Sequence, residues 1–126
     1  MLADQPIFAS LPAADLARAR TWYAEQLDLK PVEEDSAGNF WFETGGARFF
    51  VYESQFAGTN QATAAAWTVP DVTSAVAELR GRGVVFEEYD MGEYVTQDGV
   101  MTLPDGSKGA WMKDSEGNIL GLFQQA

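Results

Sequence analysis

The sequence contains neither cysteine nor histidine among its 126 residues. Without cysteine the chain can form no disulfide, thiolate nucleophile or zinc–sulfur site, and this absence fits a cytoplasmic location. Without histidine it lacks the side chain that most often serves as a general base or transition-metal ligand. Together the two absences exclude the usual Ser-His-Asp and Cys-His catalytic sites.

Basic residues and long apolar runs are also scarce. Eight Lys and Arg stand against 19 Asp and Glu, which gives a net charge of −11. Because proteins bind nucleic acid by neutralising phosphates with Lys and Arg, we expect no nucleic-acid partner. No apolar run approaches the ~20 residues of a membrane helix, so we expect no membrane partner either. The negative charge either serves solubility alone or attracts a cationic ligand.

Apolar residues are plentiful, at 46 % of the chain, and they include four Trp and eight Phe. They fall into an internal repeat of one strand, one helix and three strands. Asp15 and Asp71 are the expected N-caps of helices over 15–27 and 71–80, and Pro12 is expected to end the first strand. The strands are expected at 6–11, 32–35, 40–44 and 48–53 in the first half, and at 64–69, 84–86, 109–113 and 119–124 in the second.

This pattern predicts an α+β fold of two tandem βαβββ modules. Module one spans 5–54, a linker spans 55–62, and module two spans 63–125. Each half has one helix, which can cover one face of its sheet and leaves the other face open. We therefore expect the two open faces to form a barrel-like cleft. A sheet with an exposed apolar face would also tend to associate with other apolar surfaces. We therefore expect a homodimer, formed side by side or by exchange of modules.

Two segments resemble the vicinal oxygen chelate superfamily, which contains glyoxalase I, the bleomycin-resistance proteins and the extradiol dioxygenases. The first helix carries the pattern of that superfamily at Asp15, Leu16, Arg18, Ala19, Trp22, Tyr23, Leu27 and Leu29. The segment 114–120 is similar to its Asp-Pro-Asp/Glu-Gly-Asn hairpin, with Ser115 in place of the proline. The resemblance implies the glyoxalase/bleomycin resistance fold over essentially the whole chain, and it implies no particular activity.

The resemblance also implies four positions for a divalent metal, which enzymes of the superfamily bind through His, Glu or Gln. In this sequence these positions are Phe8, Phe50, Ala64 and Gly121. None of these side chains can bind a hard or borderline cation, so we expect no metal and no cofactor. A site built from Asp and Glu alone stays open as an alternative.

Strand alternation indicates which side chains line the expected cleft. Trp41 and Trp111 fall at equivalent places in the two modules and could sandwich a planar ligand, while Gly121 would leave room for it. The segment 91–108 is either a lid over the cleft or a surface hairpin. The predicted ligand-binding residues are Phe8, Ser10, Trp41, Arg48, Phe50, Tyr52, Ala64, Tyr94, Met101, Trp111, Gly121 and Phe123.

Our leading functional prediction is metal-independent binding of a small hydrophobic or aromatic molecule, with a positive charge favoured by the rings and the net charge. This resembles drug sequestration by the bleomycin-resistance proteins, an antibiotic resistance function. One alternative is a glyoxalase-like lyase, isomerase or dioxygenase. Another is a regulatory or structural dimer in which the aromatic side chains fill the cleft as plain core.

Overall fold

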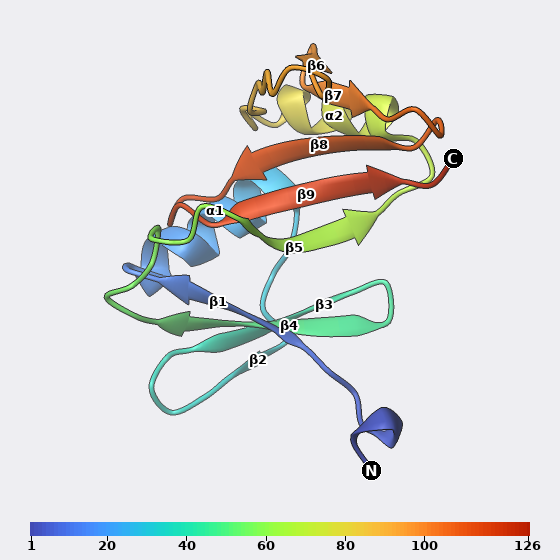
Figure 1. Cartoon of the computed structure of the whole chain (residues 1–126). Coiled ribbons are helices and arrows are strands. Elements are labelled where there is room, and N and C mark those ends of the chain that lie inside the picture. Colours follow the sequence, from blue (N-terminus) through green and yellow to red (C-terminus); the bar gives the residue numbers. More distant parts are fainter.

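The computed structural model describes residues 1–126 as two β-sheets with one long helix each (Figure 1). The first sheet has the strand order β1-β4-β3-β2 and the second the order β5-β9-β8-β7-β6. The α+β architecture predicted from the repeat is therefore confirmed, and neither sheet closes into a barrel. The first half contains η1 (Leu2–Asp4), β1 (Ala9–Ala13), α1 (Leu16–Leu27), β2 (Glu33–Glu34), β3 (Phe40–Thr44) and β4 (Ala47–Glu53). The second contains β5 (Thr63–Thr68), α2 (Val72–Gly81), β6 (Thr96–Gln97), β7 (Val100–Thr102), β8 (Lys108–Lys113) and β9 (Ile119–Gln124).

The two halves share one connection pattern. In each, the first strand pairs in parallel with the last one, β1 with β4 and β5 with β9, while the other pairs are antiparallel. The helices begin where the sequence predicts, because Asp15 accepts a hydrogen bond from the Arg18 amide at 3.0 Å and Asp71 accepts one from the Ser74 amide at 3.1 Å. Neither helix has the length and apolar character needed to cross a membrane.

Two strand predictions are wrong. Pro12 lies inside β1, opposite Tyr52, rather than ending the strand. Because β1 is an edge strand, the N–H group that proline lacks is not needed for pairing, and the strand can continue through Pro12. The strand expected at 84–86 is reduced to one bridge between Phe86 and Met112. There the amide of Val84 bonds back to the Leu79 carbonyl at the end of α2, at 3.1 Å, so the backbone is not free to join the sheet.

The buried core runs across both modules as one cluster of 16 residues. It is built from the sheet faces that carry the helices. Phe49 on β4 and Trp67 on β5 make a ring contact between the modules, with centroids 6.0 Å apart. Near the end of α1, Asp28 also lies 3.7 Å from Arg82 of the second module. The helix-bearing faces therefore meet within the chain, and the opposite faces stay free.

A carboxylate in the β8–β9 hairpin clamps the second module to the start of α1. Glu116 accepts hydrogen bonds from the amides of Ala14 and Asp15 and from the Arg18 guanidinium, each at 2.9 Å. Its side chain is 0 % exposed. Burial opposes ionisation, but the bonds from Arg18 and Ser115 prevail and lower the pKa of Glu116 to about 2. Ser115 thus supports the clamp from the position of the superfamily's proline.

A second buried carboxylate completes this junction. Asp114 accepts two backbone bonds, from the amides of Glu116 and Asn118, which close the hairpin. It also accepts the phenol of Tyr23 on α1 at 2.6 Å and the side-chain amide of Asn118 at 2.8 Å. Burial, together with the adjacent carboxylate of Asp114, raises the pKa of Tyr23 well above its usual value. The hairpin predicted from the sequence therefore joins the modules as well as reversing the chain.

Candidate functional site

One face of the first sheet carries a connected row of aromatic rings, which we call the aromatic face. Phe8 lies 4.6 Å from Trp41 and Trp41 lies 4.7 Å from Phe50, measured between ring centroids. Phe50 and Tyr52 are stacked 6.2 Å apart. Phe8 is 50 % exposed and the other three rings are half-buried. Strand alternation produces this face, because Phe49 on β4 points into the core while its neighbours on both sides point away.

Arg48 is the basic residue of the aromatic face. Its guanidinium lies over the Trp41 ring, 4.8 Å from the centroid, and donates to Glu33 on β2 at 2.6 Å. The pair with Glu33 is exposed and contributes little stability, whereas the contact with the ring orients the side chain. Ser10 on β1 lies opposite Phe50 and belongs to the same face.

The free face of the second sheet is organised by Trp111, which lies opposite Gly121 in the register of β8 and β9. A Cβ added to Gly121 would lie 3.4 Å from the indole nitrogen, and one added to Gly109 would lie 2.9 Å from the same ring. The indole therefore covers both glycines, and Tyr89 contacts it at 5.7 Å. The expectation that Gly121 leaves open space for a ligand is wrong, because Trp111 fills that space.

This packing predicts the effect of a side chain at position 121. Gly121→Glu should displace the Trp111 indole toward water and shift tryptophan emission to longer wavelength. Gly121→Ala is the matched control, since its Cβ would meet neighbours at ordinary contact distances of 3.4 and 3.5 Å. Identical emission spectra for the two variants would contradict the placement of Trp111 over Gly121.

The structure divides the predicted site between two separate faces. Trp41 contacts rings of its own module only, and so does Trp111, so the chain does not bring the two tryptophans together. Ala64 on β5 is half-buried, and Phe123 on β9 is 38 % exposed. A cleft that contained both tryptophans would need a second copy of the chain.

The segment 91–108 forms a hairpin, β6–β7, that extends the second sheet from the edge of β8. Its turn places Asp98 and Gly99 at positive φ, as a two-residue hairpin requires. Met101 is buried at 4 % exposure, whereas Tyr94 is 40 % exposed. The surface-hairpin alternative therefore describes this segment in the single chain.

The four positions that hold metal in the enzymes of the superfamily do not fit a metal here. Phe8 and Phe50 carry rings, Ala64 a methyl group, and Gly121 no side chain at all. Nor do three His, Cys, Asp or Glu side chains come together anywhere in the structure. Hard and borderline cations require oxygen, nitrogen or thiolate donors, and these positions offer none.

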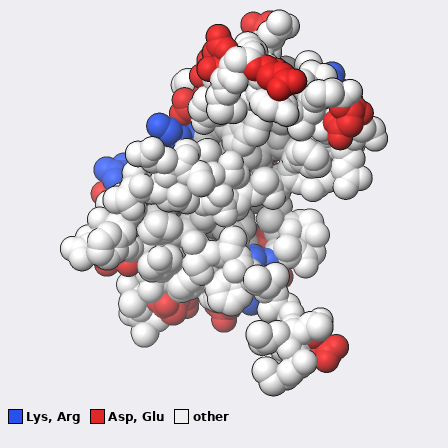
Figure 2. Space-filling view, in the orientation of Figure 1, with Lys and Arg blue, Asp and Glu red and all other residues white.

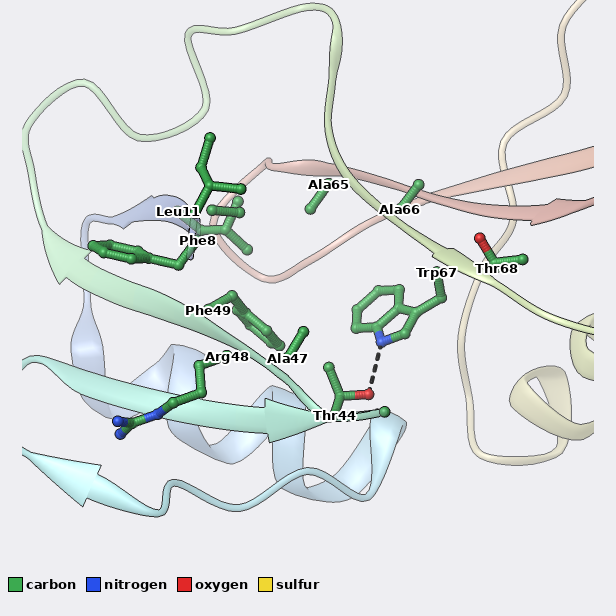
Figure 3. Close-up of a pocket in the computed structure, with 13 residues that line it drawn as sticks. Phe8, Leu11, Thr44, Ala47, Arg48, Phe49, Ala65, Ala66, Trp67 and Thr68 are labelled. Atoms are coloured by element: carbon green, nitrogen blue, oxygen red, sulfur yellow. Dashed lines mark hydrogen bonds between the residues drawn. The ribbon is translucent and has the colours of Figure 1, made fainter. Parts of the chain in front are cut away.

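A cavity of about 600 Å³ lies between the modules, at the tip of the β3–β4 hairpin (Figure 3). Figure 2 shows that acidic side chains gather on the outer parts of the molecule, while the hollow between the modules is mostly uncharged. Only Phe8 and Arg48 of the predicted site lie on its wall. The other lining residues were not among those predicted from the sequence. The lining residues are Ile7, Phe8, Ala9, Leu11, Thr44, Gly45, Ala47, Arg48, Phe49, Ala65, Ala66, Trp67 and Thr68.

No family model and no curated protein sequence matches the chain. Solved structures do match it over almost its full length. A glyoxalase/bleomycin resistance protein from Catenulispora acidiphila is 19 % identical, with a TM-score of 0.69 and coverage of 95 % of this chain and 97 % of the other. A lactoylglutathione lyase from Agrobacterium tumefaciens is 18 % identical, with a TM-score of 0.67 and coverage of 95 % and 93 %. The fosfomycin resistance protein FosX from Listeria monocytogenes is 10 % identical, with a TM-score of 0.70 and coverage of 98 % and 94 %.

Proposed function

We propose, on the premise that this chain has the glyoxalase/bleomycin resistance fold of the vicinal oxygen chelate proteins, that it binds a small hydrophobic or aromatic molecule without a metal. The site is the aromatic face. One observation carries the proposal: the rings of Phe8, Trp41 and Phe50 are connected and accessible on a free sheet face. Phe8 and Phe50 also stand at two of the positions that the family resemblance implies for metal ligands.

The chemistry of the aromatic face favours a planar ligand. Each contact between two aromatic rings contributes about 0.5–1.5 kcal/mol beyond the burial of their surface. Trp41 already lies between the rings of Phe8 and Phe50, and a planar ligand could add a further ring to this row. Glu43 lies opposite Arg48 in the register of β3 and β4, and Glu33, opposite Trp41 on β2, accepts a hydrogen bond from the Arg48 guanidinium. A positive charge on the ligand would be attracted by these carboxylates and by the net charge of −11.

A homodimer is part of the proposal, because one chain supplies only one aromatic face and the free face around Trp111 lies elsewhere. Pairing of two copies, side by side or by exchange of modules, would cover both apolar faces. Sedimentation equilibrium at micromolar concentration should then give twice the chain mass. If the chain is a monomer at all concentrations, the homodimer part of the proposal is wrong.

Trp41→Ala tests the aromatic face directly. We expect this substitution to weaken binding of a planar aromatic probe about tenfold, because the aromatic face loses the ring that contacts both Phe8 and Phe50. Isothermal titration calorimetry measures the change, and Trp22→Phe on α1, away from this face, is the control. Equal affinities for the two variants would place the ligand elsewhere.

Two further measurements separate the proposal from the alternatives. Protein purified without chelator would contain one divalent metal ion per chain if the chain were a glyoxalase-like enzyme. Bleomycin and fosfomycin resistance appear in the names of two structural neighbours. If this chain sequesters an antibiotic, cells that express it should tolerate more of the drug. The cytoplasmic location remains a prediction.

A further inference from the structure

We infer that the cavity between the modules is a second binding site, for a small, neutral, apolar molecule with one hydrogen-bond acceptor. It lies on the other side of β4 from the aromatic face. Ala47 and Phe49 line the cavity (Figure 3). Phe50, the next residue along β4, points to the opposite face by strand alternation. The two sites therefore share β4, and Phe8 and Arg48 belong to both, but their other side chains differ.

The size and lining of the cavity set the class of ligand. About 600 Å³ is within the range of roughly 300–1,000 Å³ typical of small-molecule sites. Leu11, Phe49, Ala65 and Trp67 give it an apolar wall on both modules. A molecule the size of a two-ring aromatic would replace contacts with water by contacts with these side chains.

The absence of a charged group facing the cavity makes the ligand neutral. Arg48 is the one charged residue on the wall, and its guanidinium is held on the other face, over Trp41 and against Glu33. A carboxylate or ammonium group in the cavity would lose its hydration without gaining a partner of opposite charge. Charged ligands are therefore disfavoured here, in contrast to the aromatic face.

Thr44 and Thr68 both line the cavity, and the Thr44 hydroxyl gives it a polar contact at the module boundary. The indole N–H of Trp67 donates to Thr44 Oγ1 at 3.1 Å across the module boundary (Figure 3). That oxygen accepts from Trp67, and the structure shows no hydrogen bond donated by the Thr44 hydroxyl, whose hydrogen therefore stays available. It can donate to a carbonyl or ether oxygen of a bound molecule. This contact selects ligands that carry one acceptor over pure hydrocarbons.

The test compares two probes of similar shape, neutral 2-acetylnaphthalene and anionic 2-naphthoate, titrated by calorimetry into the full chain. We expect saturable binding of the neutral probe and at least tenfold weaker binding of the anion. Ala47→Leu, which adds a larger side chain at the exposed hairpin end, should fill the cavity and weaken binding of 2-acetylnaphthalene at least tenfold. Thr44→Val should weaken that probe about fivefold but change the affinity for naphthalene less than twofold.

Phe50→Ala separates this inference from the proposed function, because it alters the aromatic face while its ring partners, Trp41 and Tyr52, do not line the cavity. Unchanged binding of 2-acetylnaphthalene in that variant supports the cavity. The inference is overturned if the neutral probe does not bind saturably, if it binds no better than the anion, or if Ala47→Leu leaves its affinity unchanged. It is also overturned if Phe50→Ala abolishes binding of the probe.

Discussion

Glu116→Gln should lower the free energy of unfolding at pH 7 by about 3 kcal/mol. The carboxylate of Glu116 is fully buried and holds two amides and the Arg18 guanidinium. A glutamine of the same shape would turn its NH₂ group toward one of these donors and leave that donor without an acceptor. The shift of the Glu116 pKa from 4.5 to about 2 corresponds to a similar energy, roughly 3 kcal/mol.

The effect should also depend on pH in a defined direction. Because the pKa of Glu116 is lower in the folded state, its contribution is fully present above pH 4.5 and is lost as the pH falls toward 2. Urea unfolding at pH 7, 4 and 2.5 should therefore show the difference between wild type and Glu116→Gln shrinking with acid. Glu25→Gln, an exposed glutamate on α1, is the control and should change little at any pH. A difference that stayed constant down to pH 2.5 would falsify the role of the charge.

Gly117→Ala should destabilise the chain by a similar amount, about 3 kcal/mol, for a steric reason. Gly117 has φ +87, a conformation that alanine adopts at a cost of about 1 kcal/mol. In addition, its Cβ would lie 2.9 Å from the Cα of Gly58 in the linker. A backbone atom cannot move aside as a flexible side chain can, so the hairpin and the linker would have to separate.

Gly46→Ala isolates the steric part of this prediction. Gly46 has a similar φ of +81, but an added Cβ there would meet nothing within 4 Å. It should therefore cost only about 1 kcal/mol, which is the conformational term. Thermal unfolding of both variants measures the difference in stability. Equal losses of stability would mean that contact with Gly58 in the linker does not restrict the side chain at position 117.

Features of the fold that rest on local chemistry could be predicted from the sequence. The helix caps Asp15 and Asp71, the hairpin at 114–118 and the closing strand each follow from neighbouring residues. Alternation also predicted correctly that Trp41, Phe50 and Tyr52 share one face of the first sheet. The prediction that Pro12 ends the first strand was wrong because the effect of a proline depends on whether its strand lies at the edge of the sheet. The neighbouring residues in the sequence do not give that information.

The contacts between elements could not be predicted in the same way. The cavity around Trp67 exists because of how the modules sit against each other, and Thr44 and Trp67 are 23 positions apart in sequence. The filled space beside Gly121 depends on the rotamer of Trp111. One signal was available in the sequence: Arg18 and Glu116 belong to the two segments that resemble the superfamily, and their opposite charges could have indicated that those segments meet.

The position of the clamp also determines how the modules can move. Glu116, Gly117 and Gly58 all lie at one end of the module boundary, together with the start of α1. Near the tip of the β3–β4 hairpin, the hydrogen bond from Trp67 to Thr44 and the ring contact between Phe49 and Trp67 cross between the sheets. Because the clamp holds this end through four hydrogen bonds, we expect any rotation between the modules to pivot there. A small angular change there becomes a larger displacement at the hairpin tip, where the mouth of the cavity widens or narrows.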